Sequence, residues 1–151
     1  HRVIPLCASP TSAATTGTVK ETLATCAIAA GRLAGNLDWL EIEAGGTTAA
    51  NANSKAVGID LVGTGTTTCI TQSHASNALS WVVRCKILRS SATAEVLSGT
   101  TYRGTSTLQI TTTTAAEDTA TALTINVFAT TPTASADATL TWMTVVYVDF
   151  P

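Results

Sequence analysis

The chain has 151 residues, of which 45% are hydrophobic, 12% are charged and 5% are aromatic, and its formal net charge is −2. This length suits one domain with a sizeable core. Eight Lys and Arg residues against ten Asp and Glu residues leave no basic surface for nucleic acid or anionic lipid. No apolar run approaches the roughly 18 residues that a membrane-spanning helix needs. We therefore expect one soluble domain that binds neither nucleic acid nor a membrane.

The first 18 residues have no regular hydrophobic pattern, and they contain Pro5, Pro10 and Gly17. This composition predicts an N-terminal arm or linker, with the folded domain covering residues 19–151. The arm carries an apolar group, formed by Val3, Ile4 and Leu6. Such side chains need a surface to cover them, which we expect to be the chain's own body, a sister subunit or a partner protein.

From residue 20 onward the hydrophobic pattern has a period of two, which is typical of β-strands. The aliphatic residues at 40, 42 and 44 alternate with Trp39, Glu41 and Glu43, so aliphatic and acidic side chains should lie on opposite faces of a strand. Residues 63–65, with two glycines, should form a turn. The strands predicted in this half are 23–28, 39–44, 55–62 and 67–71.

The strongest strand pattern covers residues 79–87, where Arg84 and Lys86 should face outward and Trp81, Val83 and Cys85 inward. The last strand is apolar on much of both faces, so we expect it in the middle of a sandwich or at a subunit interface and not at a free edge. The remaining strands predicted in this half are 95–98, 106–112, 122–129 and 139–150.

Eight or nine short strands without a convincing helix predict an all-β fold. An antiparallel β-sandwich of the jelly-roll type, with about eight strands, accommodates this number. Threonine tracts such as 111–114 suit its exposed faces, because β-branched side chains favour strands while the hydroxyl keeps the surface polar.

The four cysteines, Cys7, Cys26, Cys69 and Cys85, are too widely spaced for a zinc site. An even number permits two disulfides, but a chain of this length does not need them for stability, and Cys85 lies among inward-facing apolar residues. We therefore expect free, buried thiols.

No group of residues in the sequence forms a convincing catalytic or metal site. Ser73 and His74 are adjacent, but they are expected in a polar loop at 72–77 and not as a nucleophile beside a base. Glu41 and Glu43 share a strand face that is expected to be solvated. The acidic pair at 117–118 lacks the spacing of a calcium site. We predict a protein that is not an enzyme and has no catalytic residue, metal or cofactor.

Two segments carry a resemblance to a known group of proteins. Residues 27–36 (AIAAGRLAGN) lead into 40–55 (LEIEAGGTTAANANSK), and the second half is Thr-rich and closes with a strand. Together they resemble tailed-bacteriophage virion proteins with a jelly-roll domain, although Ala29 and Arg32 replace the proline and threonine that are usual in that turn.

The resemblance implies a homotrimer on the virion, more on the capsid surface than on the tail, assembled in the host cytoplasm. Because the chain has no shaft, we expect a capsid decoration (cement) protein that bridges subunits of the major capsid protein or another virion protein. The residues expected at the partner interface are Val3, Ile4, Leu6, Trp39, Asn51, Asn53 and Tyr147.

The alternative is a receptor- or carbohydrate-binding terminal domain of a phage tail fibre or spike, since jelly rolls serve several functions. In that case, exposed Trp39 or Tyr102 would stack on sugar rings. A sugar site requires an exposed aromatic residue beside convergent polar groups, whereas a decoration protein requires a large apolar contact surface and an ordered arm.

Overall fold

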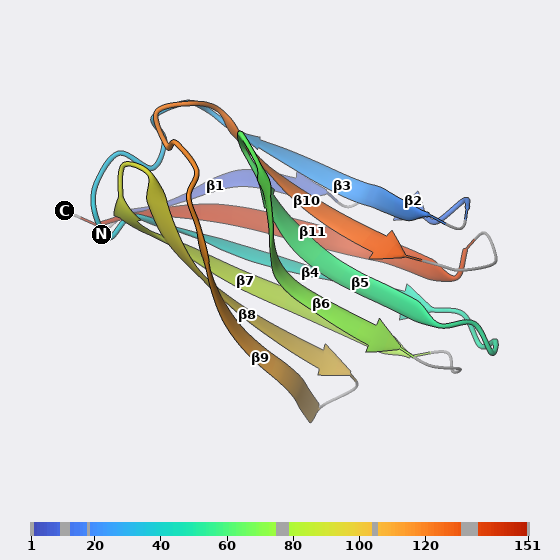
Figure 1. The fold of residues 1–151 in the computed structure, drawn as a ribbon. Coiled ribbons are helices and arrows are strands. Elements are labelled where there is room, and N and C mark those ends of the chain that lie inside the picture. Colours follow the sequence, from blue (N-terminus) through green and yellow to red (C-terminus); the bar gives the residue numbers. More distant parts are fainter. Residues whose placement is uncertain are drawn as a thin grey trace.

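The fold is given by a computed structural model, which describes residues 2–9, 13–17, 19–74, 79–103, 106–130 and 136–150. Every regular element in these ranges is a β-strand, and the strands form two antiparallel sheets that face each other (Figure 1). The all-β sandwich predicted from the sequence is confirmed. No helix in the described ranges is long and apolar enough to cross a membrane.

The larger sheet, sheet A, has the order β1-β11-β4-β7-β8-β9, with the short β2 also paired to β11. Sheet B has the order β3-β10-β5-β6. The strands of sheet A are β1 (Arg2–Ser9), β2 (Ala13–Ala14), β4 (Trp39–Thr48), β7 (Ser80–Ser91), β8 (Ala94–Arg103), β9 (Ser106–Ala115) and β11 (Ala138–Asp149). Those of sheet B are β3 (Lys20–Ile28), β5 (Lys55–Val62), β6 (Thr66–His74) and β10 (Leu123–Thr130).

Eight of these strands form a jelly roll. The antiparallel pairs β1–β11 and β4–β7 lie in sheet A, and the pairs β3–β10 and β5–β6 lie in sheet B. The described strands exceed the expected eight because the hairpin β8–β9 extends sheet A beyond β7 and β2 adds a short pairing at β11. The last strand, β11, is internal to its sheet, as its two apolar faces predicted.

The N-terminal segment is an edge strand and not a free arm. Residues 2–9 form β1, which pairs with β11, and Ile4 and Leu6 pack against the core. The chain's own body therefore covers Ile4 and Leu6, whereas Val3 is exposed. Residues 1, 10–12 and 18 of the expected arm lie outside the described residues.

The core lies between the sheets and follows the predicted alternation. On β4, Leu40, Ile42 and Ala44 are almost fully buried, while Glu41 between them is exposed. The facing sheet contributes further buried aliphatic residues from β5 and β10. This apolar filling leaves the opposite face of sheet A free to carry polar side chains.

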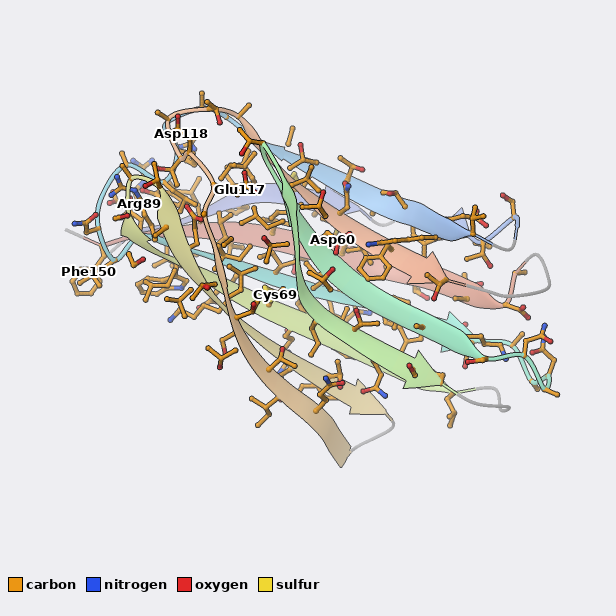
Figure 2. All side chains as sticks on the ribbon, viewed as in Figure 1. Asp60, Cys69, Arg89, Glu117, Asp118 and Phe150 are labelled. Carbon is orange, nitrogen blue, oxygen red and sulfur yellow. A yellow bond between two sulfur atoms is a disulfide. The ribbon has the colours of Figure 1, made fainter. Side chains whose placement is uncertain are left out.

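The cysteines are paired, so the expectation of free thiols is wrong. Cys7 on β1 is bonded to Cys26 on β3, and Cys69 on β6 is bonded to Cys85 on β7. Each bridge joins sheet A to sheet B, and Figure 2 shows Cys69 between the two sheets. The sequence shows only that cysteines face the core; their opposition across the sandwich depends on the packing of the two sheets.

The expected polar loop at 72–77 is also partly wrong. Residues 72–74 continue β6, because Gln72, Ser73 and His74 pair with β5, and His74 is buried. Residues 75–77 lie outside the described residues. Ser73 is exposed while the neighbouring His74 is buried, as alternation along a strand requires. The two side chains therefore lie on opposite faces and do not form a nucleophile–base pair.

Candidate functional site: a groove on the outer face of sheet A

The outer face of sheet A carries two rows of polar side chains. In the first row, Glu41 on β4 lies opposite Lys86 on β7, which lies opposite Ser98 on β8. In the second row, two residues along each strand, the same positions are Glu43, Arg84 and Thr100. Each row thus contains a carboxylate, a cation and a hydroxyl. Alternation along the strands brings these side chains to one face.

These two rows form the floor of a shallow groove with a volume of about 300 Å³. The strand β11 closes one side with Thr144 and Val146, which lie opposite Glu43 and Glu41. The residues that line the groove are Glu41, Ile42, Glu43, Arg84, Cys85, Lys86, Ser98, Thr100, Thr144 and Val146. The groove therefore spans four adjacent strands of a rigid sheet.

Arg84 is the best-anchored cation of the groove. Its Nε donates a hydrogen bond of 2.7 Å to Oε2 of Glu43, and its Nη1 lies 3.4 Å from the hydroxyl of Tyr102. The hydrogen bond to Glu43 raises the pKa of Arg84. The guanidinium carbon also lies 5.0 Å from the centre of the Tyr102 ring. Arg84 is therefore held in place by Glu43 on one side and by Tyr102 on the other.

Trp39 lies just beyond one end of the groove, two residues before Glu41 on β4. Its Nε1 donates a hydrogen bond of 2.8 Å to Oε1 of Glu41, and the Nζ of Lys86 lies 4.1 Å from the centre of its ring. The Phe150 ring lies 6.3 Å away, tilted by 42°. Figure 2 shows Phe150 at the end of the sandwich where the chain termini lie. Because lysine is flexible, its ammonium can leave the ring face when a ligand stacks there.

Trp142 lies just beyond the other end of the groove, against a glycine of β4. It lies opposite Gly45 on β4. A Cβ at Gly45 would lie 2.7 Å from each of three ring atoms of Trp142, namely Cε2, Cζ2 and Nε1. These distances place the indole edge formed by Nε1, Cε2 and Cζ2 against the glycine. Only glycine leaves room for the ring, which is partly exposed.

Two of the residues predicted to bind a partner come together on this outer face. Val3 lies opposite Val148, which lies opposite Trp39, so Val3 and Trp39 share one row. Val3 is 58% exposed, whereas Trp39 is partly buried. Of this pair, Trp39 lies next to the groove, whereas Val3 lies two strands away on β1.

Asn51 and Asn53, also predicted to bind a partner, support the fold at the other end of the molecule. Both amide groups donate hydrogen bonds to the buried carboxylate of Asp137, that of Asn53 over 2.8 Å. The buried ammonium of Lys55 is bonded to the carbonyl oxygens of Asn51 at 3.2 Å and Asn53 at 3.0 Å. The Asn-rich segment thus forms an internal polar network, and its interface role stays a prediction.

Tyr147 is buried at the edge of a second hollow. Its hydroxyl donates a hydrogen bond of 2.8 Å to Asp38, which also accepts bonds from the backbone of Gly35 and Phe150. Burial and the bond to Asp38 raise the pKa of Tyr147 to about 12. The hollow, of about 450 Å³, is lined by Arg2, Arg32 and the segment 29–35 among others. Tyr147 therefore acts in this chain as a buried support for that segment.

The acidic residues that the sequence left as a charged loop are partly buried. Glu117 is 3% exposed and accepts hydrogen bonds from Thr64 N at 2.7 Å, Thr64 Oγ1 at 3.0 Å and Gly65 N. Its own backbone N–H donates to Oε2 of the fully buried Glu95. Figure 2 shows Glu117 at the end of the sandwich that carries the termini. Within the described ranges no three His, Cys, Asp or Glu residues are placed to hold a metal ion.

Some residues of the groove were predicted from the sequence and others were not. The alternation on two strands predicted the outward Glu41, Glu43, Arg84 and Lys86, and Trp39 and Tyr102 were recognised as possible sugar contacts. The sequence did not predict that β4 and β7 are neighbours, or that Trp142 lies over Gly45. The adjacent glycines at 45 and 46 in a strand were the available signal, because glycine in a strand often marks a close approach.

No protein-family model matches this chain, and no curated protein matches it in sequence. Solved structures are similar to it at low identity. One is the CBM2 module of the evolved Dit of Lactobacillus casei BL23 phage J-1, with 9% identity and a TM-score of 0.46 over 84% of this chain and 71% of that one.

Two viral structures are also similar. The structure of infectious bursal disease virus Gx strain has 14% identity and a TM-score of 0.34 over 97% of this chain and 31% of the viral one. The VP2 subviral particle of infectious bursal disease virus has 13% identity and a TM-score of 0.25 over 98% of this chain and 41% of the viral one. This chain thus spans less than half the length of either viral chain. The ligand of this protein must be inferred from its own surface.

Proposed function

We propose that this protein binds an uncharged glycan in the groove on the outer face of sheet A. The observation that carries the proposal is the pairing of aromatic rings at both ends of the groove with two rows of polar side chains between them. Sugars have apolar C–H faces that pack on aromatic rings and hydroxyl groups that bond to carboxylates, cations and hydroxyls. The groove offers both kinds of contact on one surface.

The charge of the groove supports a ligand without net charge. Glu41 and Glu43 contribute two negative charges, and Arg84 and Lys86 contribute two positive charges, so their formal charges cancel. A charged glycan of either sign would meet two like and two opposite charges, so the groove offers it no net electrostatic attraction. A neutral glycan can use all four groups as hydrogen-bond partners.

The arrangement favours binding over hydrolysis. A glycosidase uses one carboxyl group as a general acid, which must carry a proton. Glu43 accepts the 2.7 Å hydrogen bond from Arg84 at its Oε2 atom, so it is placed as a hydrogen-bond acceptor. Glu41 accepts the hydrogen bond of Trp39. Both carboxylates therefore serve in the proposal as hydrogen-bond acceptors for sugar hydroxyls.

The experiment that tests this function uses the tryptophans of the groove as reporters. Trp39 and Trp142 border the groove, whereas Trp81 is buried in the core. Intrinsic fluorescence should change on addition of uncharged oligosaccharides from a panel of glucose, galactose, mannose, xylose and N-acetylglucosamine polymers. Galacturonate oligomers should produce no change. The proposal is overturned if no glycan on a broad array binds at millimolar concentration.

A matched pair of variants ties binding to the groove. Lys86 lies over Trp39 on sheet A, and Lys20 lies 3.8 Å from the Phe128 ring centre on sheet B. Lys86→Met should lower glycan affinity several-fold, because it removes a hydrogen-bond donor and unbalances the charge. Lys20→Met should leave the affinity unchanged. Equal effects of the two substitutions would place binding elsewhere.

The capsid decoration function, the homotrimer and the virion location stay predictions of the resemblance. Light scattering tests the predicted homotrimer, because a decoration protein of the expected kind should have the mass of three chains in solution. A monomer that binds glycans would favour the carbohydrate-binding alternative outright.

A further inference from the structure

The two aromatic ends of the groove are far apart along the strands. Trp39 is the first residue of β4, and Trp142 covers Gly45, six residues further along the same strand. A strand rises about 3.3 Å per residue, so the two ends are about 20 Å apart. This span exceeds the length of a single sugar ring. One sugar therefore cannot contact both aromatic side chains.

The polar floor between these ends repeats itself. The set Glu41, Lys86 and Ser98 is followed two residues further along each strand by Glu43, Arg84 and Thr100. The two sets are displaced by about 7 Å along the strands, from a rise of about 3.3 Å per residue. Both present a carboxylate on β4, a cation on β7 and a hydroxyl on β8. A surface whose hydrogen-bond donors and acceptors repeat at a fixed spacing matches a ligand whose donors and acceptors also repeat.

The flanking strands favour a ligand that lies along the strands and not across them. On the β11 side the groove is lined by Thr144 and Val146, one beside each row. On the far side of β8, Ile110 of β9 lies opposite Thr100 and is 72% exposed. The hydroxyl groups of Thr144 on β11 and Thr112 on β9 also flank the rows. The charged side chains of the groove, however, lie only on β4 and β7, in a strip that runs with the strands between Trp39 and Trp142.

We propose that the groove binds a linear chain of several sugars that runs parallel to β4 and β7. Successive sugars bond to the two polar rows, and sugars further out stack on Trp39 and Trp142. This inference rests on the proposed function, because it concerns the length and direction of a glycan in the same groove.

The test measures affinity against glycan length by calorimetry with the full chain. The probes are the monosaccharide to hexasaccharide members of the glucose, mannose and N-acetylglucosamine series. Affinity should rise more than tenfold with length and then level off once the chain reaches both aromatic ends. Trp39→Ala and Trp142→Ala should each lower the affinity for the longest ligand about tenfold and change the affinity for the shortest one less.

The possible outcomes separate the two proposals. If a monosaccharide binds as tightly as the hexasaccharide, or if only one of the two tryptophans matters, glycan binding stands and the extended ligand is overturned. If no member of any series binds and the array is also negative, both are overturned. Circular dichroism shows whether each variant is folded, and Ser98→Ala with Thr100→Val provides a milder pair that should reduce affinity in both rows.

Discussion

The two faces of sheet A are built from alternate residues of the same strands, but they are stabilised in different ways. On the inner face Leu40, Ile42 and Ala44 are buried, and Cys85 is bonded to the facing sheet. On the outer face Glu41 and Arg84 are exposed. The inner face is sealed by apolar packing and covalent links, so the outer face can carry charged groups with little effect on stability. Neighbouring residues of one strand therefore contribute to stability on one face and to the proposed glycan site on the other.

The largest effect should come from deleting an inner side chain. Leu40→Ala leaves a cavity at a fully buried position, so the free energy of unfolding should fall by about 3–4 kcal/mol. Glu41→Ala, one residue along and exposed, should change it by less than about 0.5 kcal/mol. Urea unfolding of both variants measures the difference. Similar losses for the two would show that the faces do not differ as described.

Removal of a disulfide should weaken the inner face and leave the groove intact. Cys69 and Cys85 are separated by 16 residues, a loop for which cross-linking contributes about 3 kcal/mol. The double variant Cys69→Ala, Cys85→Ala should lose that stability. Its glycan affinity at low temperature should match that of the parent, since both sulfurs lie on the inner side. A parallel loss of affinity would mean that the groove depends on this bridge.

Unlike removal of the disulfide, a substitution at Gly45 should affect glycan binding more than stability. The Cβ of Gly45→Ala would meet the indole of Trp142 at 2.7 Å and displace it. Glycan affinity should fall about tenfold, which corresponds to about 1.4 kcal/mol, while unfolding should change less because the ring is partly exposed. Calorimetry and thermal unfolding measure the two effects. Unchanged affinity would remove Trp142 from the binding surface.

The smallest effect should appear as a dependence of stability on pH. Burial raises the pKa of Glu95, which faces Glu117 and Arg89, so the folded state holds this proton more tightly than the unfolded state. Stability from this group is present below the ordinary glutamate pKa of about 4.3 and decreases as pH rises through the raised value. Glu95→Gln should flatten that decrease in urea unfolding across the acidic range.

A control separates this effect from the general titration of the protein. Glu41→Gln removes an exposed carboxyl group on the outer face and should leave the pH dependence of stability as it was. If the parent and Glu95→Gln show the same dependence, the buried carboxyl does not contribute to it.

The local pattern of the chain predicts strands well because burial on one face imposes a period of two. Lys55–Val62 was predicted with the bounds observed for β5, and the outward position of Arg84 and Lys86 follows from the same rule. What the pattern lacks is the order of strands within a sheet. Three features join residues from separate strands or loops and so were not predicted. They are the Cys69–Cys85 disulfide, the burial of Glu117 and the contact of Trp142 with Gly45.

The two disulfides lie at one level of the sandwich. Cys7 and Cys85 belong to a single row of sheet A, with Val145 and Ile42 between them. Both bridges therefore connect the sheets across the same layer of the core, at the level between the two polar rows of the outer face. In evolutionary terms, a surface above such bridges can accept many sequence changes before the fold fails. Substitutions in the outer groove should therefore be tolerated by the fold more readily than substitutions in this layer of the core.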